Sequence, residues 1–91
     1  MPKYVIERDL PGAGKLSAAE LQAIARKSNE VIDSLAGRAQ WLQSYVTDDK
    51  LFCVYIADDA ASVEEHAALG GFPCNHVRQV RSVIDPVTAD A

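Results

Sequence analysis

The sequence has few basic residues, few cysteines and histidines, and no long apolar run. Its 91 residues hold 9 lysines and arginines against 13 acidic residues, which gives a formal charge of −4. Proteins that bind nucleic-acid phosphates or anionic lipids need a basic surface, so we expect no nucleic acid and no membrane as a partner. No segment approaches the ~20 apolar residues of a membrane helix, and residues 1–8 show no signal-peptide core. A cytoplasmic protein is expected.

The scarcity of cysteine bears on the redox state of the chain. Cys53 and Cys74 stand 21 residues apart, without a Cys-x-x-Cys spacing. The disulfide frameworks of small secreted proteins are denser than this, so we expect reduced thiols.

The rest of the composition is that of one globular domain. Hydrophobic residues make up 48% of the chain and charged residues 24%, as in ordinary folded proteins. We expect a single domain over residues 1–91, with 85–91 as a C-terminal tail. A chain of this size buries only roughly 60 to 70% of its unfolded surface, so association would add stability. A homodimer is therefore expected.

Local patterns predict the first two elements. Residues 3–8 are rich in β-branched and aromatic types and are followed by turn residues, which indicates a strand. Ser17 and Glu20 have the spacing of a capping box, and apolar residues then recur every three or four positions. This pattern predicts a helix over residues 18–36, with Gly37 in the left-handed position that follows many helices.

Residues 40–57 change to a pattern typical of two strands joined at the polar centre Asp48-Asp49. Pairing of Val46 with Leu51 divides the hairpin between two faces. One face carries Leu42, Ser44, Val46, Leu51, Cys53 and Tyr55, and the other carries Trp41, Gln43, Tyr45, Phe52, Val54 and Ile56. Both sets are largely apolar, whereas a sheet with one solvated face alternates apolar and polar residues. Both faces should therefore be covered.

A second helix is predicted over residues 60–69, between a cap at Asp58 or Asp59 and Gly70-Gly71. A final strand is predicted over residues 76–84. The order strand, helix, strand, strand, helix, strand favours an α+β fold, the ferredoxin-like plait, with two helices on one face of an antiparallel four-stranded sheet. The opposite face would then remain free for dimerisation.

The loop Pro11–Ser17 lies between a strand and a helix, as phosphate-binding loops do, but its spacing excludes one. Such a loop needs a glycine five positions before Gly14 and a hydroxyl residue after Lys15, where Asp9 and Leu16 stand. A flexible turn is expected here.

His66 is the most informative candidate for chemistry. It stands three residues after Val63, on the side of the second helix that should face the sheet. Two interpretations stay open: a buried neutral histidine hydrogen-bonded to a strand side chain, or a ligand to a divalent ion or small molecule. The residues that could join it are Glu7, Arg8, Cys53, Tyr55 and His76. Imidazole, carboxylate and thiolate together suit Ni²⁺, Zn²⁺ or Cu²⁺ better than Mg²⁺. Cys53 and Tyr55 are equally compatible with core packing, and His76 with exposure.

Three segments carry a family resemblance: Ser44–Tyr55, Glu65-His66-Ala67 and Gly71-Phe72-Pro73. With them the sequence resembles the short nickel-binding-protein-like family, classed among domains of unknown function, over nearly its whole length. The resemblance implies a ferredoxin-like fold of the dimeric α/β-barrel type, a homodimer, and nickel binding with a role in sequestration or homeostasis. It implies no established reaction.

The matching positions of that family are Glu7, Cys53, Tyr55 and His66. Two positions depart from it, because Gln43 stands where relatives often have histidine and Phe52 where they often have tyrosine. His76 adds a potential ligand that relatives often lack.

Three hypotheses follow. The first is a cytoplasmic dimer that binds Ni²⁺ or a similar ion through a set drawn from His66, Glu7, His76, Cys53 and Tyr55. The second is a dimeric α/β-barrel enzyme, similar to monooxygenases or isomerases, that acts on a small apolar ligand between sheet and helices. There His66, Tyr55 and Arg8 would serve as acid, base or anion anchor. The third is an oligomeric or regulatory partner without a small-molecule site.

Overall fold

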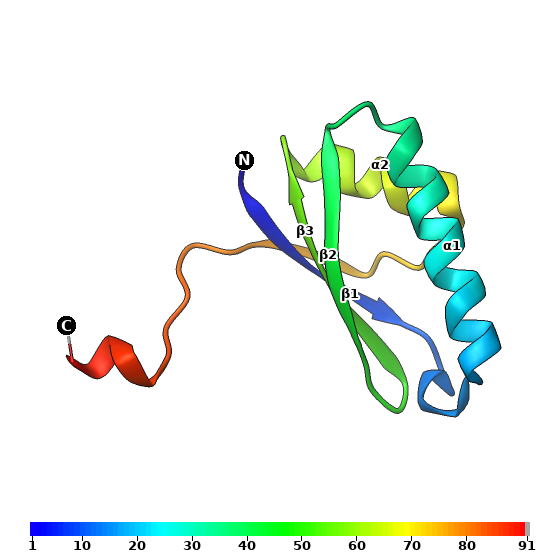
Figure 1. Cartoon of the computed structure of the whole chain (residues 1–91), viewed down its shortest axis with the longest axis horizontal. Coiled ribbons are helices and arrows are strands. Elements are labelled where there is room, and N and C mark those ends of the chain that lie inside the picture. The colour runs from blue at the N-terminus through cyan, green and yellow to red at the C-terminus, as the bar shows by residue number, and fades with distance from the viewer. Residues whose placement is uncertain (91) are drawn as a thin grey trace.

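The computed structural model describes residues 1–90, and Figure 1 follows the chain from its blue N-terminus to its red C-terminal end. Its elements are β1 (Lys3–Asp9), the short 3-10 helix η1 (Ala13–Lys15), α1 (Ala18–Ser34), β2 (Ala39–Val46), β3 (Lys50–Ala57), α2 (Ala60–Gly70), β4 (His76–Gln79) and the short 3-10 helix η2 (Pro86–Asp90). No helix among residues 1–90 combines the length and the apolar character needed to cross a membrane.

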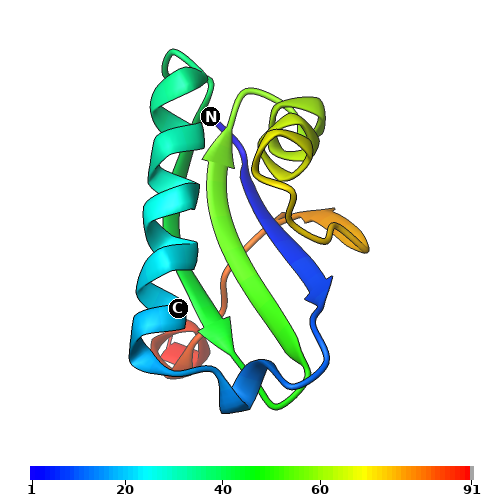
Figure 2. The ribbon, with the colours of Figure 1, turned by 90° about the vertical axis from the view of Figure 1, so that its right-hand side faces the viewer.

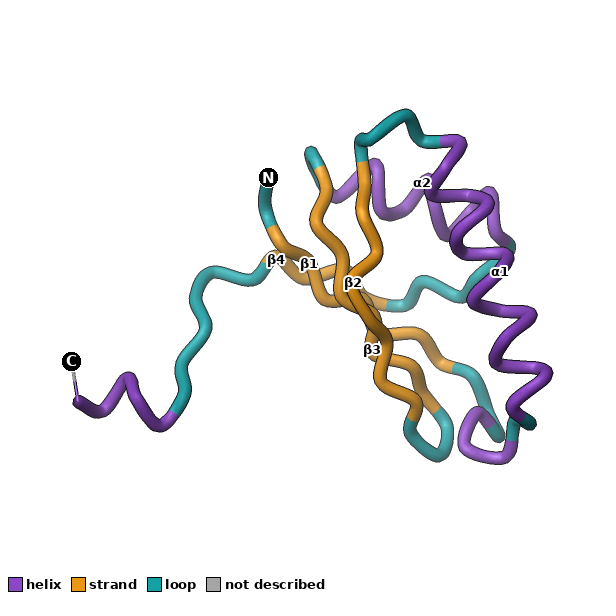
Figure 3. Tube along the Cα trace, in the orientation of Figure 1, coloured by secondary structure: helices purple, strands orange, loops and turns teal. Residues whose placement is uncertain are grey.

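The four strands form one antiparallel sheet in the order β2-β3-β1-β4. Helices α1 and α2 lie on the same side of this sheet, as Figures 1 and 2 show from two directions. Figure 3 separates the same two layers by colour, with strands in orange and helices in purple. The predicted α+β ferredoxin-like fold is confirmed.

Helix α1 begins as the sequence predicts and ends earlier. The Ser17 hydroxyl accepts from the Glu20 backbone N–H at 3.1 Å, while the Glu20 carboxylate accepts from the Ser17 N–H at 3.0 Å. These two bonds satisfy amide groups that have no partner inside the helix. At the other end, Ala36 already has a positive φ of 52°, ahead of Gly37 at 82°. The helix therefore stops at Ser34, and the prediction of 36 was wrong by two residues.

Buried and exposed residues alternate along β1 and β3, and this alternation decides which residues face the helices. Tyr4, Ile6 and Arg8 of β1 are buried, whereas their neighbours in the strand are partly or fully exposed. Every second residue of β3 is likewise buried: Leu51, Cys53, Tyr55 and Ala57. Successive side chains of a strand point to opposite faces, so these residues form the inner face of the sheet. They pack with apolar side chains of the helices in one hydrophobic core.

Strand β2 contains an irregularity that the sequence pattern did not predict. Val46 pairs with Leu51 as expected, but the register shifts between Trp41 and Gln43, so that Leu42 is an extra residue. Trp41 consequently pairs with Tyr55 and contacts the core. The prediction that placed Trp41 on the opposite face from Tyr55 was wrong, because one bulged residue reverses the face to which the preceding residues of the strand point.

Strand β4 is shorter than predicted, at His76–Gln79 instead of 76–84. Its hydrogen-bonding partner is β1, and the Val80 N–H donates to Lys3 O, at the first residue of β1. Beyond that point β1 offers no further backbone groups, so pairing ends.

The segment from residue 80 onward leaves the sheet on the side opposite the helices (Figures 1 and 2). It carries exposed apolar side chains, with Val83 at 72%, Ile84 at 79% and Val87 at 72% of full exposure. Ala91, the last residue of the predicted tail 85–91, lies outside the described residues.

The loop before α1 holds the tip of the β2–β3 hairpin. Asp49 Oδ1 accepts from the Gly12 N–H at 2.9 Å, and the Gly14 N–H donates to the Asp48 carbonyl at 2.9 Å. A Cβ on Gly14 would lie 3.0 Å from the Asp48 Cα, a tight contact with backbone, so this close approach favours glycine. The loop that the sequence predicts as a flexible turn is thus fixed against the hairpin.

Candidate functional site

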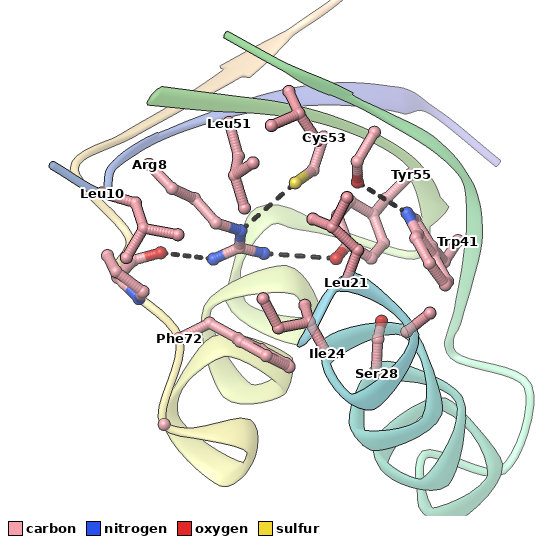
Figure 4. Close-up of a pocket in the computed structure, with 15 residues that line it drawn as sticks. Arg8, Leu10, Leu21, Ile24, Ser28, Trp41, Leu51, Cys53, Tyr55 and Phe72 are labelled. Carbon is pink, nitrogen blue, oxygen red and sulfur yellow. Dashed lines mark hydrogen bonds between the residues drawn. The ribbon is translucent and has the colours of Figure 1, made fainter. Parts of the chain in front are cut away.

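A cavity of about 340 Å³ lies between the inner face of the sheet, helix α1 and the loop that follows α2 (Figure 4). Its lining is mainly apolar and comes from β1, α1, both strands of the hairpin and that loop. The lining residues are Arg8, Leu10, Leu21, Ile24, Ala25, Ser28, Trp41, Ser44, Val46, Leu51, Cys53, Tyr55, Gly71, Phe72 and Pro73. Cavities of this size and character are typical of small-molecule sites.

Arg8 is the charged residue of this lining. It occupies an inner-face position of β1 and is only 2% exposed. Its Nε donates to Cys53 Sγ at 3.4 Å, one terminal nitrogen donates to the Tyr55 hydroxyl at 3.2 Å, and the other donates to the Pro73 carbonyl. The guanidinium carbon also lies 5.5 Å from the centre of the Phe72 ring. Figure 4 shows the guanidinium held between β3 and the loop after α2.

The guanidinium is buried without a counter-ion. Among residues 1–90, no carboxylate forms an ion pair with Arg8. Burial works against its charged form, but attraction to Tyr55 and the contacts with Cys53 outweigh this and raise the pKa of Arg8 above its ordinary value. Arg8 therefore carries a full positive charge.

Tyr55 presents a neutral hydroxyl to the same place. Burial raises its pKa above the ordinary value, although the neighbouring Arg8 acts in the opposite direction. The phenol therefore stays protonated at neutral pH, when it can donate or accept a hydrogen bond but is a poor general base.

The end of α2 sets the position of Phe72 and Pro73. Gly71 has a φ of 70°, the left-handed conformation that glycine adopts at helix ends, and the Phe72 N–H donates back to Ala67 O at 2.9 Å. The Phe72 ring stacks on His66 with centroids 5.5 Å apart and an angle of 21°. Neither Phe72 nor Pro73 was singled out as part of a site from the sequence, because only the tertiary fold brings this loop to Arg8.

His66 is fully buried and lies on the sheet-facing side of α2, as its spacing from Val63 predicts. Its Nε2 lies 3.2 Å from Ser28 Oγ and 3.3 Å from the Ser28 carbonyl oxygen. Since a carbonyl only accepts, this contact places the ring proton on Nε2. Burial lowers the pKa of His66, and the nearby Arg8 charge adds to this effect. The partner of His66 is thus on α1, and not on a strand as one of the two interpretations supposed.

The other two sequence-predicted ligands lie on the outer face of the sheet. Glu7 and His76 are directly paired across β1 and β4, with His76 Nε2 at 3.8 Å from Glu7 Oε2. Lys50 Nζ lies 3.3 Å from the same Glu7 oxygen and 2.6 Å from Asp9 Oδ1. The hydrogen bonds to Asp9 and Glu7 raise the pKa of Lys50 above its ordinary value.

The five candidate ligands therefore divide between two faces. His66, Cys53 and Tyr55 lie on the helix side, whereas Glu7 and His76 lie on the other side, because alternate residues of a strand point in opposite directions. Within one protomer the structure does not bring Glu7 to His66. In the part of the chain that the structure describes, no three residues among His, Cys, Asp and Glu group together as a metal site would require.

The two faces differ in the charge of ligand they suit. On the helix side the buried Arg8 charge lies beside Cys53 and Tyr55 and would repel a metal cation there. On the outer face a carboxylate and an imidazole stand together, a donor pair that suits a divalent transition ion. The geometry thus places a buried positive charge on the helix side of the sheet and a carboxylate–imidazole pair on the outer face.

Fold and cavity together define a class: a small ferredoxin-like α+β protein with a pocket between its sheet and its helices. The sequence profile of the family described as "Nickel responsive protein SCO4226-like" matches residues 4–80. The chain belongs to this family, as its resemblance to nickel-binding-protein-like sequences implies. None of the curated proteins compared with the chain matches it in sequence.

A solved structure supports the same fold. The chain is similar to the protein in the "Crystal structure analysis of SCO4226 from Streptomyces coelicolor A3(2)", with a TM-score of 0.76 over 90% of this chain and 99% of that one. The two sequences are only 10% identical in this comparison. The likeness therefore establishes the fold alone.

Proposed function

We propose that this protein is a nickel-binding homodimer in which Glu7 and His76, on the outer face of the sheet, supply metal ligands. The observation that supports this proposal is the cross-strand pair itself, with 3.8 Å between His76 Nε2 and Glu7 Oε2, in a chain of a nickel responsive family. Imidazole and carboxylate are both suitable ligands for Ni²⁺.

The pair is accessible to an ion from solvent. The His76 side chain is 54% exposed and that of Glu7 is 29% exposed. Strand pairing fixes the two backbones opposite each other, so both side chains leave the sheet on the same face. The Lys50 ammonium competes with a cation for the Glu7 carboxylate and would have to move away when metal binds.

One protomer supplies only two of the ligands that Ni²⁺ requires, and a second subunit is the natural source of others. The outer face offers a surface for it, with a row of partly exposed apolar residues at Val5, Phe52, Val54 and Ile56. The segment from residue 80 leaves the sheet on this same side with its own exposed apolar residues. Dimerisation through the outer face would cover both the apolar row of the sheet and the apolar residues of this segment.

Calorimetric titration of the untagged protein with Ni²⁺ tests the metal site. We expect Glu7→Gln and His76→Ala each to weaken binding by at least tenfold, since each removes one ligand. Lys50→Ala should strengthen binding, because it removes the competing cation. Glu64→Gln, an exposed carboxylate on α2, is the matched control and should bind as the unchanged protein does.

The same titration decides between the two faces. The hypothesis that His66 ligates nickel predicts loss of binding in His66→Ala, whereas a site at Glu7 and His76 predicts unchanged binding. Because only neutral imidazole ligates metal, affinity should fall as the pH is lowered. Binding that survives both Glu7→Gln and His76→Ala would contradict the proposal.

The enzyme hypothesis depends on the cavity. Arg8 there is suited to anchor an anion, but the Tyr55 phenol is held protonated and the His66 ring lies behind Phe72, with its Nε2 on Ser28. The arrangement favours binding of a ligand over proton transfer to it.

A further inference from the structure

The cavity contains an uncompensated buried charge. An isolated ion in an apolar interior is costly unless it is paired or fully hydrogen-bonded. Arg8 is 2% exposed, and its three hydrogen-bond acceptors within residues 1–90 are a thiol, a hydroxyl and a carbonyl. None of the three is a carboxylate, and no carboxylate among residues 1–90 forms an ion pair with this guanidinium. The charge therefore attracts an anion.

The guanidinium also has donors to spare. Arginine carries five N–H groups in a planar fork. Nε and each terminal nitrogen of Arg8 make one hydrogen bond apiece, which leaves one N–H on each terminal nitrogen. Two adjacent N–H groups of this kind match the two oxygens of a carboxylate.

The rest of the cavity is suited to an apolar body. Leucine, isoleucine, alanine, valine, tryptophan, phenylalanine and proline side chains make up most of its walls. The polar side-chain groups other than Arg8 are hydroxyls, the Cys53 thiol and the Trp41 indole N–H, which donates to Ser44. Its volume of about 340 Å³ equals that of roughly eleven molecules of liquid water. This is enough for an acid with a short alkyl chain or one or two rings.

The lining also restricts the charge of the ligand. Arg8 is the one lysine or arginine among the lining residues. A single buried cation balances a single negative charge, whereas a phosphate dianion would bring a second charge into an apolar space.

We infer that this cavity binds an apolar monocarboxylate, with its carboxylate on the Arg8 guanidinium and its apolar part between the sheet and α1. This inference is independent of the nickel site, which lies on the opposite face of the sheet. Ligand binding here would neutralise the Arg8 charge and fill the space under α1.

Titration calorimetry in EDTA tests the inference, with octanoate as the probe. Octanol is the matched neutral compound, since it has the same chain without the charge, and inorganic phosphate is the matched small anion. We expect saturable octanoate binding and an increase in melting temperature, at least tenfold weaker binding of octanol, and no binding of phosphate. Equal affinity for octanoate and octanol would overturn the role of Arg8 in binding the carboxylate. Tighter binding of phosphate than of octanoate would overturn the inference that the ligand has an apolar body.

Two variants test whether octanoate binds in the cavity. Arg8→Met removes the charge at similar length and should reduce octanoate affinity to that of octanol. Since a change at a buried arginine can also disturb folding, Ala25→Phe is the second variant, because it fills the cavity from α1 without touching Arg8. Ala23→Phe, exposed on the same helix, is its control. Octanoate binding that survives Ala25→Phe, or that is absent from the unchanged protein, would overturn the inference.

Discussion

His66 Nε2 lies 3.2 Å from Ser28 Oγ, and this buried contact joins the middle of α2 to the middle of α1. Because burial lowers the pKa of His66, the folded protein binds a proton there less readily than the unfolded chain does. Above about pH 6.5 the ring is neutral in both states and adds no pH dependence. Below it the unfolded chain takes up the proton, so the free energy of unfolding falls as pH falls.

The first prediction follows from this difference. Between pH 6.5 and 5 the stability of the protein should fall with a slope of up to about 1.4 kcal/mol per pH unit from this group. Urea unfolding at several pH values measures it. His66→Gln, which keeps a donor toward Ser28, should flatten this slope, whereas His76→Gln on the exposed histidine should not. If stability fell with pH equally steeply in His66→Gln and in the unchanged protein, His66 would not be the source of this pH dependence.

A second prediction concerns the contact of Phe72 with Gly70. A Cβ on Gly70 would lie 2.3 Å from Phe72 Cε2, so Gly70→Ala must displace the ring from its place between His66 and Arg8. Alanine favours a helix over glycine by about 1 kcal/mol, but overpacking of a core costs about 1 to 3 kcal/mol.

Gly70→Ala is therefore expected to lower the melting temperature and to weaken octanoate binding. Leu69→Ala, on an exposed residue of the same turn, should change neither. Differential scanning calorimetry with and without octanoate provides both values. A stabilised Gly70→Ala variant would mean that the ring moves without cost.

A third prediction tests the start of α1. Ser17→Ala removes the hydroxyl that accepts from the Glu20 N–H and should destabilise the protein by about 1 kcal/mol. For a domain of this size that loss corresponds to a fall of about 4 to 8 °C in melting temperature. Ser17→Asp, which retains an acceptor, should recover most of it, and a failure to do so would show that the cap is not the cause.

A fourth prediction concerns the outer face of the sheet. Val54→Lys places a charge in the apolar row of this face and should convert the proposed dimer into a monomer, as measured by size exclusion with light scattering. Gln22→Lys adds the same charge to an exposed position of α1 and should leave the dimer intact. An unchanged protein that is monomeric at micromolar concentration would contradict dimerisation itself.

Much of the fold could be predicted from local sequence. The capping box at Ser17, the turn at Asp48-Asp49 and the glycine that follows α2 each act within a few residues, so they are visible in the sequence. The bulge at Leu42 could not be predicted, because nothing in the residues of β2 alone shows where the register against β3 shifts. The short β4 could not be predicted either, since it ends where its partner β1 ends.

The candidate site was predictable in part. Arg8 stands in the alternating row of Tyr4 and Ile6, which marks it as an inner-face residue once β1 is recognised. The carbonyl of Pro73 and the ring of Phe72 come to it from more than sixty residues away, through a loop whose path depends on the left-handed Gly71. The separation of Glu7 from His66 likewise follows only when the sheet face covered by the helices is known.

The loop that holds Pro73 against Arg8 continues into an exposed cysteine, Cys74, while the other cysteine, Cys53, is buried. A thiol-reactive fluorophore would therefore attach at Cys74 alone, next to the loop that closes one side of the cavity. Partial shielding from water raises the pKa of the Cys74 thiol, so labelling would proceed best at mildly alkaline pH. The native sequence thus supplies an optical reporter for occupancy of the cavity, without any engineered substitution.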